Sequence, residues 1–229
     1  MKGAALLESV KGGLIVSVQA EPDSVLNTPE AIALLARCAA RNGAVAVRVE
    51  GVERLRAVRA AIDLPIVGLI KRRHPGFEPY ITSTLEEIDA VAAAGAEIVA
   101  FDATGRPRSG AATTAELVCA VKDRGAIAFA DCARVADARA AADAGADIVA
   151  TTLAGYTSQT RGCALPALAL VTEIAAFHAF AVCEGGIATV EDARRAFEAG
   201  AAAITVGTAI TNVDALVARF AAAVPRGGR

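Results

Sequence analysis

Short apolar runs alternate along the chain with longer stretches in which alanine is frequent. The runs are four to six residues long and rich in Ile and Val, as at residues 13–16 and 98–101. Strands that are buried on both faces of a parallel sheet have this composition. We therefore predict eight strands, near residues 13–18, 44–49, 65–70, 97–101, 126–130, 147–151, 180–183 and 203–206.

The stretches between the apolar runs carry helix signals. Three of them end at Gly95, Gly145 or Gly200, directly before the next apolar run. Glycine readily adopts the left-handed conformation that closes a helix. Thr28 and Thr189 are hydroxyl N-caps followed by proline or acidic residues, which mark helix starts. The predicted helices lie near residues 29–41, 51–62, 84–94, 113–124, 134–144, 165–176, 189–199 and 211–222.

Eight strand–helix repeats are typical of a closed (β/α)₈ barrel, the TIM barrel, more than of an open doubly wound sheet. No G-x-G-x-x-G sequence follows the first strand, as a dinucleotide-binding open sheet would require. The length of 229 residues suits one barrel, and no Pro/Gly/Ser-rich linker divides the chain. We therefore predict the α/β class, with residues 1–229 forming a single TIM-barrel domain.

Composition excludes several classes of protein. The apolar runs are far shorter than the roughly 20 residues that span a bilayer. A formal charge of −2 with interspersed signs leaves no basic stripe for nucleic acid. Glu8 interrupts the N-terminus before an apolar stretch of signal-peptide length forms, so we expect a cytoplasmic protein without membrane or nucleic-acid partners.

Cysteine and histidine usage gives no sign of a metal site. The five cysteines are scattered and never form a C-x-x-C pair, which predicts reduced thiols rather than a disulfide framework or a zinc site. The only two histidines are His74 and His178, and we expect surface or capping roles for both. We therefore expect no metal.

Polar residues end most of the apolar runs. In a TIM barrel the active site lies at the C-terminal ends of the strands, so these positions are the candidates for chemistry. The turns after strands seven and eight contain glycine, and barrels commonly bind phosphate there through backbone N–H groups. We expect phosphate at Gly185, Gly186, Gly207 and Thr208, unless these glycines merely form tight turns. The polar strand ends are Gln19, Arg48, Lys71, Asp102, Asp131, Thr151 with Thr152, and Glu184.

These strand ends lie in sequence blocks typical of one family. The blocks read I-V-S-V-Q-A, L-P-I-V-G-L-I-K-R, F-D-A-T-G-R-P-R, T-T-L-A-G-Y-T and C-E-G-G-I, in this order along the chain. In them the chain resembles the bacterial N-acetylmannosamine-6-phosphate 2-epimerase family over nearly its whole length. It departs from the family pattern at Ser109, where proline is usual, and at Gly186 and Asn212, where basic residues are frequent.

The resemblance implies an isomerase that interconverts N-acetylmannosamine 6-phosphate and N-acetylglucosamine 6-phosphate in sialic acid or amino-sugar catabolism, without an organic cofactor. Lys71 matches the family's catalytic lysine and Glu184 its catalytic carboxylate. The phosphorylated amino sugar is the expected partner, together with a second copy of the chain, since a homo-oligomer and especially a dimer is favoured. The expected contacts to the sugar are Gln19, Arg48, Asp131, Thr152 and Tyr156.

Inverting C2 of such a sugar requires one base and one acid on opposite faces of the carbon. Lys71 acts as the base if burial or Arg48 lowers the pKa of its amino group, and Glu184 faces it, although the two roles are open to exchange. Proton removal leaves an enediolate-like intermediate with negative charge on its oxygen, and Arg48 and Gln19 are the candidates to stabilise that charge.

The two aspartates at the strand ends receive different expectations. Asp131 binds a sugar hydroxyl or orients Lys71. Asp102 is instead expected to form a structural ion pair with Arg106 or Arg108.

Two other functions remain open at this point. In a class I aldolase or synthase, Lys71 would form a Schiff base with a carbonyl substrate. A regulatory barrel would bind a sugar phosphate without catalysis, but binding alone does not need the pair of Lys71 and Glu184.

Overall fold

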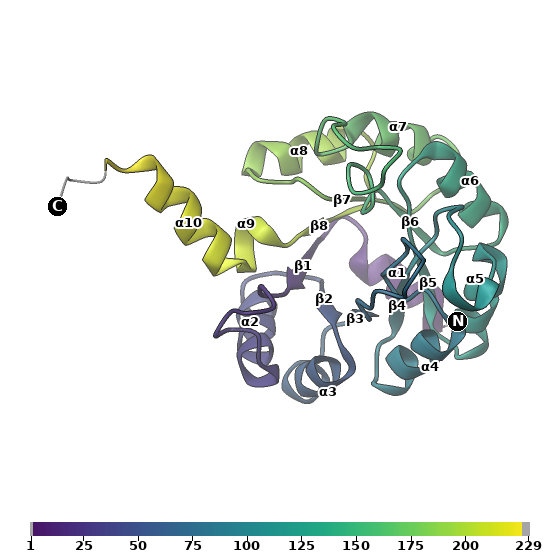
Figure 1. Ribbon diagram of the computed structural model, residues 1–229, viewed down its shortest axis with the longest axis horizontal. Helices are drawn as coiled ribbons and strands as arrows, with labels where there is room; N and C mark the ends of the chain where they lie inside the picture. The colour runs from purple at the N-terminus through teal and green to yellow at the C-terminus, as the bar shows by residue number, and fades with distance from the viewer. Residues whose placement is uncertain (1, 226–229) are drawn as a thin grey trace.

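The computed structural model of the chain describes residues 2–225, in which eight parallel strands close into one barrel (Figure 1). Neighbouring strands pair in chain order, and the last strand returns to pair with the first, with Leu14 opposite Ile204. The predicted TIM barrel is confirmed. The strands are β1 (Leu14–Val18), β2 (Ala46–Glu50), β3 (Ile66–Leu69), β4 (Ile98–Asp102), β5 (Ile127–Asp131), β6 (Ile148–Ala150), β7 (Ala181–Glu184) and β8 (Ala203–Val206).

The helices follow the strands largely as predicted. Three short elements were not predicted: the N-terminal helix, a 3₁₀ turn, and a four-residue helix that ends where the last predicted helix was expected to begin. The elements are α1 (Lys2–Val10), α2 (Pro29–Arg41), α3 (Val52–Ala61), α4 (Leu85–Ala93), η1 (Ser109–Ala111), α5 (Thr114–Asp123), α6 (Val135–Asp143), α7 (Leu168–Ala175), α8 (Val190–Glu198), α9 (Thr208–Thr211) and α10 (Val213–Ala223).

Local signals in the sequence set most helix ends. The Thr28 hydroxyl accepts a hydrogen bond from the N–H of Ala31, as an N-cap does. The glycines that follow α4, α6 and α8, namely Gly95, Gly145 and Gly200, have φ angles of 97°, 87° and 100°. These left-handed conformations close each helix and turn the chain into the next strand.

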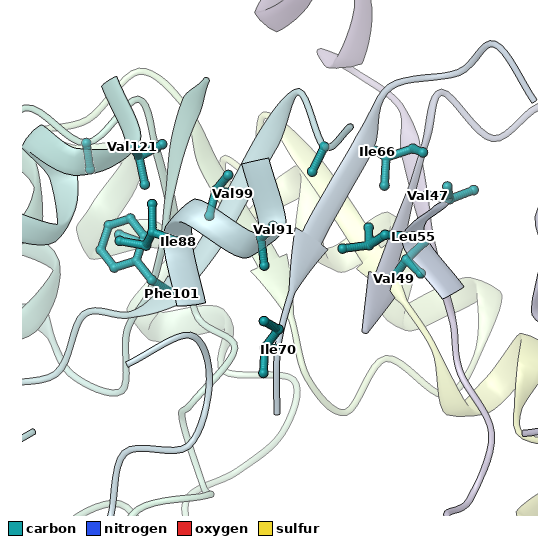
Figure 2. Packing of buried hydrophobic residues seen from close by; sticks show 14 of the residues in the cluster. Val47, Val49, Leu55, Ile66, Ile70, Ile88, Val91, Val99, Phe101 and Val121 are labelled. Carbon is teal, nitrogen blue, oxygen red and sulfur yellow. The ribbon is translucent and has the colours of Figure 1, made fainter. Parts of the chain in front are cut away.

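Side chains that alternate along each strand build two separate apolar layers. The outward-facing residues pack against the helices, and Figure 2 shows part of this layer, where Leu55 of α3 and Ile88 of α4 lie among residues of β2, β3 and β4. The inward-facing residues fill the barrel itself, together with Val10 of α1. Helix α1 therefore closes the N-terminal end of the barrel, leaving the opposite end available for a site.

In several strands an inward-facing apolar residue is followed, two positions later, by an inward-facing polar residue. The apolar member lies inside the barrel, and the polar member lies at or under its C-terminal mouth. The strand period of two thus aims the polar side chains at the mouth. The pairs are Ile15 and Ser17, Ala46 and Arg48, Phe129 and Asp131, Val182 and Glu184, and Ala203 and Thr205.

The ring of helices around the barrel is uneven. Helices α2 to α8 pack on their neighbours in sequence order, whereas α10 packs against the short α9 and stands out from the barrel (Figure 1). Within residues 2–225, no helix has the length and hydropathy needed to cross a membrane.

Candidate active site

A cavity of about 780 Å³ opens at the C-terminal mouth of the barrel. It is lined by the ends of strands β1, β2, β3, β7 and β8 and by the loop after β6. Nearly all of the residues expected to bind substrate line it together. They are Gln19, Arg48, Lys71, Thr152, Tyr156, Glu184, Gly185, Gly186, Gly207 and Thr208.

Lys71 follows β3 and is held at the rim by a short antiparallel bridge to Ile81. Its Nζ donates a hydrogen bond to Gln19 Oε1 over 2.9 Å. Partial burial of the amino group, helped by the nearby charge of Arg48, lowers the pKa of Lys71 from its usual range. A lowered pKa increases the fraction of neutral amine that is able to accept a proton.

Arg48 lies under the cavity with only 3% of its surface exposed. Its guanidinium donates two hydrogen bonds to the Asp131 carboxylate, at 3.1 and 2.7 Å, and its Nη1 lies 3.2 Å from Glu184 Oε2. The Phe129 ring lies 5.1 Å below the guanidinium, close enough for a cation–π contact. Thr152 donates a hydrogen bond of 2.5 Å to Asp131 Oδ1.

Asp131 lies below the cavity rather than on its wall. Its side chain is fully buried and does not line the cavity, because Arg48 and Thr152 occupy its two oxygens. No hydrogen bond joins it to Lys71 among the described residues. In this structure Asp131 is the counterion of Arg48, and Arg48 presents the resulting ion pair to the cavity.

Glu184 ends β7, and 12% of its side-chain surface is exposed. Burial raises the pKa of the Glu184 carboxyl to about 7, although the charge of Arg48 acts in the opposite direction. Strands β3 and β7 are four steps apart in a closed ring of eight, so Lys71 and Glu184 come from opposite sides of the barrel. Both groups line the same cavity with pKa values shifted toward each other.

The glycine turns leave their backbone donors free. Within residues 2–225, the N–H groups of Gly185, Gly186, Gly207 and Thr208 make no hydrogen bond to other protein atoms. Gly185 and Gly186 have φ angles of 100° and 76°, a backbone that glycine adopts readily because it has no Cβ.

The two departures from the family pattern near these turns have structural reasons. A Cβ atom on Gly186 would lie 2.4 Å from Cβ of Leu165, so Leu165 occupies the space that a larger residue needs. Asn212 caps α10 by accepting the N–H of Ala215 at 3.0 Å, and it donates to Glu21 Oε1 at 2.6 Å.

Thr205 and Tyr80 are examples of cavity-wall residues that were not among the expected site residues. Thr205 follows Ala203 in the inward-facing series of β8, so the strand period of two was the signal that could have found it. Tyr80 lies in the long β3–α4 loop, where no periodic pattern predicts its orientation.

The remaining candidates have structural contacts. Asp102 pairs with Arg106 at 2.7 Å, as expected, and its backbone oxygen accepts from Arg108. His74 Nε2 lies 3.1 Å from Glu87 Oε1, and His178 Nε2 lies 3.0 Å from the carbonyl oxygen of Ala146. All five cysteines are free. Within the described residues no group of three or more metal-ligating side chains is present.

The fold and the site define a class of protein. It is a (β/α)₈ barrel whose cavity at the C-terminal mouth is lined by an amine and a carboxyl, above a buried ion pair and beside glycine turns. Barrels carry their chemistry at this end.

The chain belongs to the N-acetylmannosamine-6-phosphate epimerase family. The family model described as "Putative N-acetylmannosamine-6-phosphate epimerase" matches residues 32–226. This match confirms the resemblance seen in the sequence blocks, and with it the expectation that the chain belongs to a family of isomerases.

Individual relatives agree over almost their full length. A protein of Synechococcus elongatus named as a putative N-acetylmannosamine-6-phosphate 2-epimerase is 43% identical over 222 residues, which is 95% of this chain and 96% of that one. A protein of the same name from Yersinia pseudotuberculosis is 42% identical, covering 96% and 93% of the two chains. The solved N-acetylmannosamine-6-phosphate 2-epimerase of Clostridium perfringens superposes with a TM-score of 0.92 at 34% identity, over 96% of each chain.

Proposed function

We propose that the chain is an epimerase that interconverts N-acetylmannosamine 6-phosphate and N-acetylglucosamine 6-phosphate in the cytoplasm, as a step of sialic acid or amino-sugar catabolism. The observation that carries the proposal is the pair of Lys71 and Glu184, which line one cavity from opposite sides of the barrel. The names of the relatives supply the substrate.

The hydrogen on C2 is acidic only when C1 is a carbonyl, so the open-chain aldehyde is the reacting form. One of the two groups removes the hydrogen from one face of C2, and the other delivers a proton to the opposite face. In the reverse direction the same two groups exchange roles. Partial burial and the charge of Arg48 lower the pKa of Lys71, and burial raises the pKa of Glu184 to about 7, which brings the proton affinities of the two groups closer together.

The intermediate formed between the two transfers is an enolate, which carries negative charge on the C1 oxygen. The cation of Arg48 lies in the cavity floor and supports stabilisation of that charge. Gln19 accepts from Lys71 through Oε1, which leaves its Nε2 as a further donor. Because Asp131 is the counterion of Arg48, its contribution is to hold Arg48 rather than to touch the sugar.

The phosphate is proposed to bind at the free backbone N–H groups of Gly185, Gly186, Gly207 and Thr208, which leave room for an oxyanion. Thr152 and Tyr156 lie beside these turns on the cavity wall and are proposed to contact the sugar between C2 and the phosphate.

An assay in D₂O tests this function directly. With N-acetylmannosamine 6-phosphate we expect N-acetylglucosamine 6-phosphate carrying deuterium at C2, whereas the unphosphorylated sugar should react poorly because the glycine turns stay empty. Lys71→Met should lower turnover by about 10²–10⁴-fold, the usual contribution of a general acid–base group, while phosphate binding is kept. Lys11→Met is the matched control, because Lys11 is exposed on the surface beside Glu8.

Three results would contradict the proposal. The first is near-normal turnover in Lys71→Met. The second is reductive trapping of the substrate on Lys71 by borohydride, which would indicate the Schiff base of an aldolase instead. The third is binding of the sugar phosphate without any exchange at C2, as expected of a regulatory barrel.

We also propose that the chain forms a homodimer through α10. The apolar residues Val213, Val217, Phe220 and Val224 are 42%, 61%, 67% and 60% exposed. Their spacing of four, three and four residues places them on one face of the helix and its end. A helix that stands out from its own barrel with an apolar face uncovered is well suited to pack on a second copy (Figure 1).

A further inference from the structure

Two buried polar atoms in the barrel wall lack hydrogen bonds, and they belong to neighbouring residues. Among the described residues, Glu184 Oε2 and Thr205 Oγ1 are both inaccessible to solvent and make no hydrogen bond, although Arg48 Nη1 lies 3.2 Å from Oε2 as an ion-pair partner. Glu184 of β7 and Thr205 of β8 are paired in register, and both line the cavity. Residues paired across neighbouring strands lie about 4.8 Å apart and point to the same face, so one hydrogen bond can join them.

Buried hydroxyl and carboxyl groups are rarely left without partners in proteins. Thr205 is 2% exposed, so no solvent competes for its hydroxyl. A threonine O–H rotates about its C–O bond and needs only one acceptor, whereas an ionised carboxylate needs donors. A hydrogen bond between these two atoms satisfies both groups at once.

We propose that Thr205 is a positioning residue for the Glu184 carboxyl, whose hydroxyl donates a hydrogen bond to Oε2. This inference rests on the proposed function, because it assigns the orientation of one member of the acid–base pair. With Oε2 held by Thr205 and facing Arg48 at 3.2 Å, Oε1 is the oxygen left for the molecule in the cavity. When Glu184 is protonated, the proton therefore resides on Oε1, the oxygen from which it can be transferred.

The groups that face Glu184 set the direction of the effect. Burial and the charge of Asp131 disfavour the ionised carboxylate, whereas the charge of Arg48, the hydroxyl of Thr205 and the charge of Lys71 favour it. A hydrogen bond donated by Thr205 favours the ionised form of Glu184, because hydrogen bonding to the charged form of an acid lowers its pKa. Removing that donor must therefore raise the pKa of Glu184 further.

The test compares Thr205→Val, which keeps the shape without the hydroxyl, with Thr205→Ser, which keeps the donor. The carboxyl titration of Glu184 is followed by carbon NMR on protein labelled at glutamate, with the resonance assigned by its loss in Glu184→Gln. In Thr205→Val we expect the midpoint to rise by about one pH unit, the size of a tenfold effect of one charged hydrogen bond. We expect Thr205→Ser to titrate like the wild type.

The same variants are then measured as epimerases. In Thr205→Val, kcat near pH 7 should fall about tenfold with little change in KM, because the carboxyl loses its orientation while the substrate contacts remain. Ser83→Ala is the matched control, since Ser83 Oγ is another buried hydroxyl without a hydrogen bond but lies before α4. This control should leave both the titration and kcat unchanged.

The outcomes separate this inference from the proposed function. An unchanged Glu184 titration in Thr205→Val overturns the role of Thr205, whatever the activity of the wild type. A raised titration midpoint in a protein whose wild type does not epimerise the sugar phosphate supports the contact and overturns the function instead. If Thr205→Ser behaves like Thr205→Val, the hydroxyl is not the relevant group.

Discussion

Arg48 contacts two carboxyl groups with different geometry. The Asp131 carboxylate accepts hydrogen bonds from both terminal nitrogens of Arg48 in a buried, bidentate pair. Glu184 lies 3.2 Å from only one of these nitrogens. Bidentate pairing is the strongest arrangement between arginine and a carboxylate. The charge of Arg48 is thus largely compensated by Asp131, which is why burial dominates at Glu184 and raises its pKa to about 7.

At the residue scale this predicts the pH dependence of turnover. Epimerisation needs one proton shared between Glu184 and Lys71, whichever of them carries it. Below about pH 7 both groups are protonated and no base is present, while above the lowered pKa of Lys71 both are deprotonated and no acid remains. The rate should therefore rise with pH through about 7 and fall again at alkaline pH.

Measured kcat/KM against pH checks this expectation, with Glu184→Gln as the comparison. In that variant the residual rate should have no inflection near pH 7, because the titrating carboxyl is gone. A wild-type profile that is flat from pH 5 to 9 would contradict the assignment of both groups.

At the scale of elements, the long loop between β3 and α4 places Lys71. Its segment around Ile81 inserts beside the end of β3 and bonds to both neighbours: Ile81 bridges Lys71, and its carbonyl oxygen accepts the N–H of Asp102. The buried Glu87 of α4 anchors the same loop by accepting the N–H of Ser83 at 2.7 Å. A loop held at these points keeps the lysine at the rim despite its position beyond the strand.

The glycine turn after β7 is expected to lose stability when a side chain is introduced at Gly186. Gly186→Lys would introduce a basic residue, as the family pattern described above favours at this position, yet it should destabilise this chain. The left-handed backbone alone costs about 1–2 kcal/mol for a residue with a side chain, and contact with Leu165 adds to that cost. Urea unfolding measures the difference in the free energy of unfolding.

Gly76→Lys separates the two contributions. Gly76 has a similar φ of 81° but open space around it, so it reports the cost of the conformation without the contact. We expect the loss of stability to be larger at Gly186, and Leu165→Ala combined with Gly186→Lys should recover part of it. Equal losses at both positions would show that Leu165 is not the reason for the glycine.

On the scale of the whole molecule, helices at the chain ends complete the barrel in different ways. Helix α1 closes the N-terminal end with Val10, so the cavity opens only at the opposite mouth. Helix α10 leaves the ring of helices and exposes its apolar face (Figure 1). One end of the chain thus belongs to the core and the other is available to a second copy.

The prediction at this scale concerns the oligomeric state. Val217→Asp places a charge in the middle of the exposed apolar face of α10, and it should convert a dimer into monomers of 23.1 kDa. Light scattering after gel filtration measures the mass. Val25→Asp is the control, because Val25 is 89% exposed but lies outside any helix, and its dimer should persist. A wild-type monomer, or a dimer that survives Val217→Asp, would contradict the proposal.

The sequence by itself determined the order of strands and helices, the closed barrel and the family. These features depend on signals that are local, such as the strand period of two, the N-cap of Thr28 and the glycines that end helices. It also placed Lys71 and Glu184 at strand ends, since every strand end of a barrel meets the same mouth. Helices α1 and α9 were missed because no Ser, Thr, Asp or Asn precedes the first in the sequence and the second is only four residues long.

Only the tertiary structure decided what each polar group does. Asp131 is the last residue of β5, just as Glu184 is the last residue of β7. Asp131 is nevertheless the bidentate counterion of Arg48, whereas Glu184 contacts one nitrogen of Arg48 and has a raised pKa. That difference arises from the side chains that β2, β5 and β7 bring together across the barrel. Burial and the distance between charges set a pKa, and neither quantity is encoded in residues that are adjacent in sequence.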